Sequence, residues 1–237
     1  MGRRVVGRYT LFDEIARGGM ASIHLARLNA AAGFSRTVVV KRMQPDLAHD
    51  PQFCAMFMDE ARLAARVQHP NVVQTVDVIW EAGELLLVLD YVHGTSLASA
   101  LRAASLAGQR VPISVANAIL AGTLHGLHAA HTATNEQGEA LCIVHRDVSP
   151  QNVLVGTDGI ARLIDFGVAK AVGRLQTTDA GGLRGKLAYM PPEQVVGNVA
   201  AVTDLYAAGV VLWEAWTGRR FFEADNEGAL VGACQRV

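Results

Sequence analysis

The chain contains 237 residues, of which 51% are hydrophobic and 18% are charged, and its formal net charge at pH 7 is −1. This composition is typical of a globular protein and excludes a disordered one. A net charge so close to zero argues against nucleic-acid binding and against a polybasic membrane anchor.

The cysteines and the apolar segments indicate a reducing, aqueous compartment. Cys54, Cys142 and Cys234 are widely spaced and form no CxxC pair, which argues against a disulfide framework and against a zinc site. The N-terminus lacks the apolar segment of a signal peptide, and the most apolar stretch, residues 200–216, contains Asp204 and Glu214. We therefore expect a cytoplasmic protein with no membrane segment in this chain, while tethering through a region after residue 237 stays open.

The first part of the chain is predicted to be rich in strands. Alternating and β-branched segments predict strands, Gly18-Gly19 predicts a tight turn, and one stretch has apolar residues at helical spacing. In chain order the elements are strands at 8–12, 22–26 and 37–40, a helix at 51–67 and a strand at 85–89, after which Gly94-Thr95-Ser96 is expected to break the strand pattern.

The second part is predicted to be mainly helical. Residues 113–131 and 202–216 form apolar helical patterns, a polar loop covers 135–139, and short strands flank the segments around His145 and Asp165. The fold class is therefore α+β with two lobes: a β-rich lobe over residues 1–90 and a larger helical lobe over residues 91–237.

One segment carries the residue types that phosphoryl transfer needs. In His145-Arg146-Asp147-Val148-Ser149-Pro150-Gln151-Asn152, a carboxylate is followed five residues later by an amide. A carboxylate can orient the attacking hydroxyl, and a neutral oxygen can help to hold Mg²⁺ on the phosphates. Asp165-Phe166-Gly167 follows thirteen residues after Asn152, and at that distance it predicts a second metal ligand.

These motifs, in this order, resemble the eukaryotic-like Ser/Thr protein kinases of bacteria, over roughly residues 8–237. The HRDVSPQN segment and the insertion at residues 132–141 are similar to those of kinases from myxobacteria and related soil bacteria. The resemblance implies a two-lobed protein-kinase-like fold whose C-terminal lobe is truncated at residue 237. It implies a kinase that transfers the γ-phosphate of ATP to a protein serine or threonine, with Mg²⁺ or Mn²⁺, in bacterial signalling.

The resemblance also assigns site residues. Asp147 would be the catalytic aspartate, Asn152 and Asp165 the metal ligands, and Lys41 the residue that holds the α- and β-phosphates and pairs with Glu60. The glycine-rich loop, the third strand and the hinge would bind ATP through Ile15, Ala16, Arg17, Gly18, Gly19, Met20, Ala21, Ile23, Val39, Lys41, Leu89, Asp90, Val92 and Leu154. Without the other family motifs, Gly18-Gly19 could equally be interpreted as an ordinary hairpin turn.

Two positions depart from the family pattern near the reaction centre. Ser149 stands where most Ser/Thr kinases have lysine, and Lys186 stands where they have threonine. Because the family places these positions side by side, we hypothesise that Lys186 is catalytic and supplies the charge that Ser149 lacks. The alternative is a solvated loop lysine and low activity. Ala16 and Ala21 replace two of the usual glycines.

The remaining expectations concern regulation and partners. Thr177 and Thr178 are candidate phosphosites, Asp204 is expected to tie down the catalytic loop, and the usual arginine partner of Glu193 would lie after residue 237. Expected partners are ATP and a protein substrate, with dimerisation compatible with autophosphorylation and no nucleic acid. A non-catalytic pseudokinase scaffold and a small-molecule phosphotransferase are the alternative functions.

Overall fold

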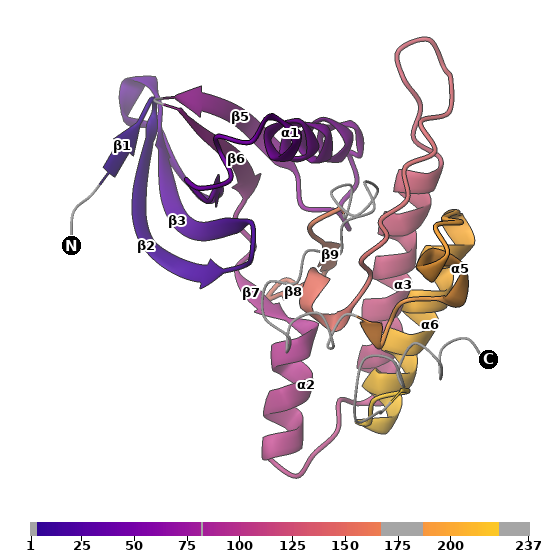
Figure 1. Ribbon diagram of the computed structural model, residues 1–237. Helices are drawn as coiled ribbons and strands as arrows, with labels where there is room; N and C mark the ends of the chain where they lie inside the picture. The colour runs from indigo at the N-terminus through magenta and orange to yellow at the C-terminus, as the bar shows by residue number, and fades with distance from the viewer. Residues whose placement is uncertain (1–3, 82, 167–186, 223–237) are drawn as a thin grey trace. The chain divides into compact units, whose positions relative to one another are not determined.

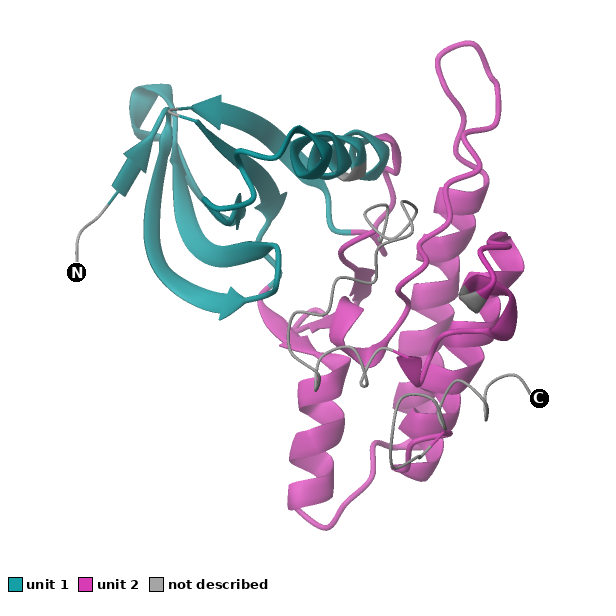
Figure 2. Ribbon diagram, viewed as in Figure 1, with its two compact units in different colours: residues 1–65, 73–92 teal, residues 66–72, 93–237 magenta. Residues whose placement is uncertain are grey.

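The computed structural model describes residues 4–81, 83–166 and 187–222, apart from the side chains of Glu60 and Val195 (Figure 1). The chain divides into two compact units (Figure 2). The first unit contains residues 1–65 and 73–92, and the second contains residues 66–72 and 93–237. The second unit therefore includes a short segment, Arg66–Val72, that comes from within the first part of the sequence. The boundary between lobes at residues 90 and 91 stays a prediction.

An antiparallel six-stranded sheet forms most of the first unit. Its strand order is β1-β2-β3-β4-β6-β5. The strands are β1 (Arg4–Val6), β2 (Tyr9–Arg17), β3 (Ala21–Asn29), β4 (Ser35–Met43), β5 (Thr75–Glu81) and β6 (Glu84–Asp90). A 3-10 turn, η1 (Ala31–Gly33), connects β3 to β4, and the helix α1 (Pro51–Arg66) follows β4.

The two faces of this sheet have separate cores. Because side chains alternate along a strand, Val38 and Val40 of β4 lie on the opposite face from Val39 and Lys41. The first face buries a cluster that includes Val38, Val40, Ala26, Leu86 and Val88. On the other face, a second cluster packs Phe57 and Ala61 of α1 against Met43, Leu85 and Leu87.

Polar bonds join the two ends of this sheet. Tyr9, the first residue of β2, and Arg8, which precedes it, both donate to Asp77 Oδ2 of the edge strand β5, at 2.8 and 2.9 Å. Glu84 of β6 accepts from Arg4 at 2.7 Å and from Arg42 at 2.7 Å. Except for the bond from Arg42, which joins the neighbouring strands β4 and β6, these contacts connect strands that are not neighbours in the sheet, which requires the sheet to curve strongly.

The second unit is built mainly of helices around a small sheet. The helices are α2 (Leu97–Leu106), α3 (Ile113–His131), α5 (Pro192–Val195) and α6 (Ala201–Thr217), with the 3-10 turn η2 (Pro150–Asn152). The strands β7 (Gly94–Ser96), β8 (Val153–Gly156) and β9 (Ala161–Leu163) form an antiparallel sheet. Residues of α3, α6, β8 and β9 share one buried core, which includes Leu127, Val153, Leu163 and Val211.

Asn71 anchors the segment 66–72 within this unit. Its Nδ2 donates to the Ala161 carbonyl at 2.7 Å, and its own carbonyl accepts from the Leu163 N–H at 2.8 Å. On α3, an added Cβ at Gly126 would lie 2.6 Å from the Asn71 carbonyl oxygen, and one at Gly122 would lie 2.8 Å from Asn71 Nδ2. The absence of side chains at these two glycines therefore lets Asn71 reach β9 past α3.

The helices predicted at 113–131 and 202–216 are confirmed, with the second extending from Ala201 to Thr217. The predicted break at Gly94–Ser96 is wrong, because these residues form β7 and pair with β8. Residues 141–144 before His145 are not a strand, whereas β8 and β9 precede Asp165.

Within residues 4–81, 83–166 and 187–222, no helix is both long and apolar enough to cross a membrane.

Candidate active site

In the first unit, four of the predicted ATP-binding residues lie on one face of the sheet. Ile23 is opposite Lys41 across β3 and β4, and Val39 is opposite Leu89 across β4 and β6. Residues directly opposite each other, and those two positions apart on a strand, point to the same side. Ile23, Val39 and Leu89 are only partly buried, unlike Val38 and Val40 on the other face. This face thus combines apolar side chains with the lysine.

Lys41 lies beside α1 on this same face. Its Nζ is 5.8 Å from the centre of the Phe57 ring, a distance at which a cation is attracted to an aromatic ring. Glu60 is one turn further along α1, and its side chain lies outside the described part of the structure. The neighbouring Asp59 is exposed and pairs with Arg62 at 3.4 Å.

The glycine-rich segment forms the hairpin between β2 and β3. Ala16 is opposite Ile23 in this hairpin, and Arg17 is opposite Ser22. At the turn, the Gly18 N–H donates to the Ala21 carbonyl at 2.9 Å. Ala21 is 5% exposed, whereas Ile15 and Arg17 are exposed, and Arg17 pairs with Glu14. The hairpin turn predicted at Gly18-Gly19 is therefore present, with Met20 as its next residue.

The predicted hinge, residues 90–92, begins at the last residue of β6. The Asp90 N–H donates to the Gln74 carbonyl at 3.0 Å, and the Asp90 carboxylate pairs with Arg36 of β4. Val92 is the last residue of the first unit. Leu154 belongs to β8 in the second unit, where it lies opposite Ser96 and Arg162.

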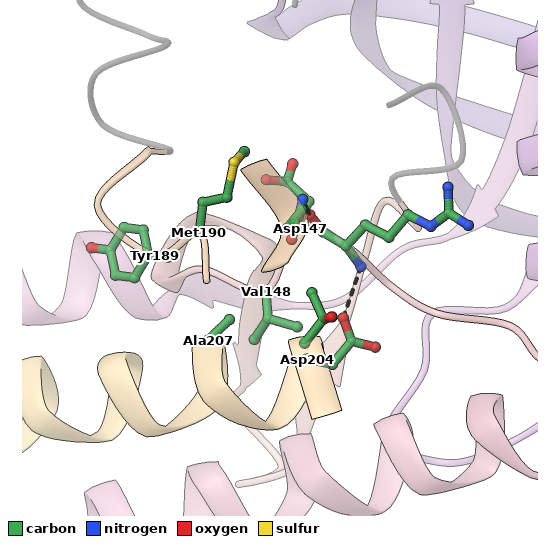
Figure 3. A pocket seen from close by; sticks show the side chains of 9 residues that line it. Asp147, Val148, Tyr189, Met190, Asp204 and Ala207 are labelled. Carbon is green, nitrogen blue, oxygen red and sulfur yellow. Dashed lines mark hydrogen bonds between the residues drawn. The ribbon is translucent and has the colours of Figure 1, made fainter. Parts of the chain in front are cut away.

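In the second unit, the side chain of Asp204 holds the backbone of the predicted catalytic segment, residues 145–152. Asp204 Oδ2 accepts from the His145 N–H and Oδ1 from the Arg146 N–H, both at 2.8 Å. Figure 3 shows Asp204 on α6 with its carboxylate directed at this segment. His131 Nε2, at the end of α3, is 2.7 Å from Oδ2. The prediction that Asp204 ties down the catalytic loop is confirmed.

His145 links this segment to Asp165-Phe166. A carbonyl can only accept, so His145 Nε2 donates to the Ile164 carbonyl at 3.0 Å, and Nδ1 accepts from the Asp147 N–H at 3.3 Å. This pattern requires the neutral imidazole. Complete burial lowers the pKa of His145, which favours the same neutral form. Its ring also lies 4.8 Å from that of Phe166.

Asn152 is oriented by a bond back to Asp147. Its Nδ2 donates to the Asp147 carbonyl at 2.8 Å, and its backbone carbonyl accepts from Ile164 at 3.0 Å. The amide nitrogen is thus directed at the loop, and the side-chain oxygen is the atom suited to a metal. Mg²⁺ takes one or two protein oxygens together with substrate phosphates rather than a closed protein cage. Asn152 and Asp165 fit that donor set, and the described residues contain no cluster of three or more His, Cys, Asp or Glu that could hold a metal.

Two residues of these motifs have left-handed backbone. The φ angles of Arg146 and Asp165 are 64° and 56°. This conformation is costly for residues other than glycine and is found where the surrounding structure imposes it, often at functional sites. At Arg146 the imposing contacts are Asp204 on the N–H and Gln194, whose Nε2 donates to the carbonyl at 2.8 Å.

Ser149 faces the interior of the second unit. It is 1% exposed, and its Oγ has no hydrogen-bond partner among the described residues. The neighbouring Pro150 is also buried. Ser149 therefore presents no charge to the reaction centre.

A small pocket lies beside Asp147 (Figure 3). Asp147 and Val148 line one side, and Asp204 and Ala207 of α6 line another, with Tyr189 and Met190 completing it. The Tyr189 hydroxyl donates to Glu214, and burial raises the pKa of Tyr189 well above its usual value. The other lining residues are Arg146, Gln194 and Thr203.

Lys186, Thr177 and Thr178 lie outside the described residues. Glu193 accepts from the Thr203 hydroxyl at 3.3 Å. The sequence reasoning missed His131 and Gln194, and in the sequence they are single polar residues far from the catalytic motifs.

The comparisons with known proteins agree with this arrangement. A family profile described as "Protein kinase domain" matches residues 9–235. The chain belongs to the protein kinase domain family, and it has the α+β fold of that family, with a β-rich first unit and a mainly helical second unit.

The relatives are bacterial kinases. The chain is 43% identical to "Tyrosine-protein kinase MasK" of Myxococcus xanthus over 228 residues, which is 96% of this chain and 35% of that protein. It is 37% identical over 231 residues to "Probable serine/threonine-protein kinase pknA2" of Bifidobacterium longum, covering 96% of this chain and 28% of that protein. "Serine/threonine-protein kinase PrkC" of Bacillus subtilis is 32% identical over 227 residues, which is 95% of this chain and 33% of that protein. The chain thus spans about a third of the length of these relatives.

Proposed function

We propose that this domain is a protein kinase that transfers the γ-phosphate of ATP to a serine or threonine hydroxyl of a protein. The observation that carries the proposal is the anchored catalytic segment. Asp204 fixes the backbone on the N-terminal side of Asp147, and Asn152 fixes the Asp147 carbonyl. Phosphoryl transfer depends mainly on such positioning, because the protein has little covalent chemistry to perform.

Each unit would supply part of the machinery. From the first unit, Lys41 holds the α- and β-phosphates, paired with Glu60. The glycine-rich hairpin covers the phosphates, and Ile23, Val39 and Leu89 contact the adenine. From the second unit, Asp147 orients the acceptor hydroxyl, while Leu154 contacts the adenine. Mg²⁺, held by Asn152 and Asp165, would neutralise charge on the phosphates.

We further propose that Lys186 supplies the positive charge that the catalytic segment lacks. In most Ser/Thr kinases a lysine at the position of Ser149 fulfils this role. The burial of Ser149 supports the proposal, because an uncharged, enclosed side chain cannot stabilise the transferring phosphoryl group. A cation from the segment before Leu187 would replace it.

A pseudokinase scaffold is not favoured. Lys41, Glu60, Asp147, Asn152 and Asp165 all retain the residue types that the reaction requires. Ala16 and Ala21, which stand where the family usually has glycines, still lie in a formed hairpin. A small-molecule phosphotransferase is likewise disfavoured by the match to the protein kinase domain family.

Tyrosine is the second candidate acceptor. It is favoured by the 43% identity to a relative named as a tyrosine-protein kinase. Against it, Gln151 stands at the fourth position after Asp147, where the tyrosine-kinase arrangement has arginine. Serine and threonine therefore remain the proposed acceptors, in line with the names of the other relatives reported above.

The cellular setting is also proposed. A reaction that consumes ATP and modifies proteins would take place in the cytoplasm, with Thr177 and Thr178 as autophosphorylation sites. Transfer between two copies of the domain would bring such sites within reach, which is the reason to expect at least transient dimerisation.

The test is incubation of the chain with ATP and Mg²⁺, followed by mass spectrometry of the chain and of a mixture of Ser-, Thr- and Tyr-containing peptides. The proposal predicts phosphoserine or phosphothreonine. Phosphate only on tyrosine would select the second candidate. ATP binding without any transfer would favour the scaffold.

A further inference from the structure

Gln44 connects the strand that carries Lys41 to the glycine-rich turn. It directly follows β4 and lies three residues after Lys41. Its backbone N–H donates to the Met20 carbonyl at 3.0 Å. Its side-chain Nε2 donates to the Gly18 carbonyl at 2.8 Å. Two carbonyls of the turn, one on each side of Gly19, are therefore held by this residue.

The two bonds have different origins. Ala21 is opposite Met43 in the pairing of β3 with β4, so the bond from the Gln44 backbone continues the ladder between these strands. Any residue except proline could make it. The bond to the Gly18 carbonyl requires a side chain with a donor at this length. It is the contribution that is specific to glutamine.

The side-chain bond fixes the direction of a peptide group. The described residues contain no cis peptide bond, so the Gly18–Gly19 peptide is trans. In a planar trans peptide the C=O and N–H point in opposite directions. With the Gly18 carbonyl directed at Gln44, the Gly19 N–H faces away from Gln44. Successive backbone N–H groups in a turn are donors suited to phosphate oxygens.

The turn at Gly18 and Gly19 depends on contacts such as the hydrogen bond from the Gln44 side chain. Because Gly18 and Gly19 lack side chains, their peptide group can rotate more readily than one between other residues. The hydrogen bond across the turn, from the Gly18 N–H to the Ala21 carbonyl, leaves the orientation of the following peptide to other contacts. Gln44 supplies one of them.

We propose that Gln44 is a positioning residue for the phosphate chain of the nucleotide. Through the Gly18 carbonyl it directs the Gly19 N–H, and it fixes the turn relative to the strand that carries Lys41. The inference rests on the proposed function, because it assumes that the turn binds nucleotide phosphates. It makes a specific claim within that function, since Gln44 would affect the affinity for phosphates and not the affinity for adenosine.

The experiment compares the binding of ATP and of adenosine by calorimetry to four proteins. Gln44→Met keeps the length of the side chain and removes the donor. Gln44→Ala removes the donor together with the side chain and adds no charge near the phosphates, which provides a second variant at this partly exposed position if the first does not fold. Gln52→Met is the matched control, because Gln52 is exposed on α1 and its bond to Asp50 comes from the backbone.

We expect both Gln44 variants to raise the Kd for ATP about two- to tenfold, the net effect of one lost hydrogen bond. The Kd for adenosine should stay unchanged, and Gln52→Met should match the wild type for both ligands. An unchanged Kd for ATP in the Gln44 variants would overturn the role of Gln44, and so would equal losses for ATP and adenosine. A wild type that binds no ATP would overturn the proposed function as well.

Discussion

The carboxylate of Asp204 and the backbone N–H of Arg146, 58 residues apart in sequence, form a 2.8 Å hydrogen bond in the interior of the second unit. Asp204 is 1% exposed, and its other oxygen accepts from the His145 N–H and lies 2.7 Å from His131 Nε2. The left-handed backbone of Arg146 is held partly by this bond. The position of Asp147, the next residue, therefore depends on a side chain of α6.

Replacing Asp204 with Asn should weaken both stability and activity. An amide has one accepting oxygen and would direct an N–H₂ group at one of the two backbone donors, leaving a buried donor unpaired. We expect a loss of about 2 kcal/mol in the free energy of unfolding, measured with urea, and a lower kcat. Asp59→Asn is the control, because Asp59 is exposed and pairs only at the surface. Equal stability of the Asp204 variant and the wild type would show that the anchor is not needed.

Gly126 and Gly209 offer a contrast between two helical glycines. At Gly126 an added Cβ would lie 2.6 Å from the Asn71 carbonyl oxygen, whereas at Gly209 nothing lies within 4 Å. Gly126→Ala should therefore destabilise the chain by about 1–3 kcal/mol, because packed backbone must move. Gly209→Ala should stabilise it by about 0.5–1 kcal/mol through the better helix propensity of alanine. Thermal unfolding measures both, and a Gly126→Ala variant as stable as Gly209→Ala would refute the packing argument.

Glu84 should make the stability of the first unit depend on pH. The hydrogen bond from Arg42, followed by that from Arg4, lowers the pKa of Glu84 in the folded state. A carboxyl with a lowered folded pKa stabilises the protein above its unfolded pKa, about 4.3 for glutamate, and this contribution is lost as pH falls through the folded value.

The variant Glu84→Gln tests this dependence. We expect it to be about 1–2 kcal/mol less stable than the wild type at pH 7, because the hydrogen bonds that two arginines donate to a charged group are weakened. The difference should shrink as pH falls below about 4.3. Glu81→Gln, at an exposed position on β5, should behave like the wild type. A difference that is independent of pH would contradict the assignment.

Much of the fold followed from the sequence because its signals are local. The helix over residues 113–131 has a long apolar pattern, and its predicted bounds are those observed. β7 could not be predicted in the same way, because it depends on pairing with β8, some 60 residues later. At Gly94 an added Cβ would lie 2.1 Å from the Val155 carbonyl oxygen. The glycine that was interpreted as a strand breaker is thus required by the close approach of two strands.

In the candidate site, too, the sequence identified some of the functional residues and not others. The resemblance to the kinase family identified Asp204 as the residue that holds the catalytic loop, and the structure confirms it. Gln44 and His131 carry no such signal, because their partners lie far along the chain: Gly18 for the first and Asp204 for the second. A lone polar residue shows its role only when folding has brought its partner within hydrogen-bond distance.

Lys186→Ala tests the proposed replacement of the missing cation. Losing one group that stabilises charge in the transition state typically costs about 100-fold in kcat, and we expect a loss of that size with little change in the Kd for ATP. An unchanged kcat in Lys186→Ala would exclude the role.

The most direct test of the central claim, that Asp147 acts in phosphoryl transfer, compares the wild type with Asp147→Asn. In the presence of Mg²⁺, the transfer of radiolabelled γ-phosphate from ATP to protein is measured for each, and ATP binding is measured on the same samples. We expect ATP binding to be retained and the rate of transfer to fall by about 100-fold or more, the contribution typical of a positioned acid–base group. Equal rates of transfer in the two proteins would contradict the account.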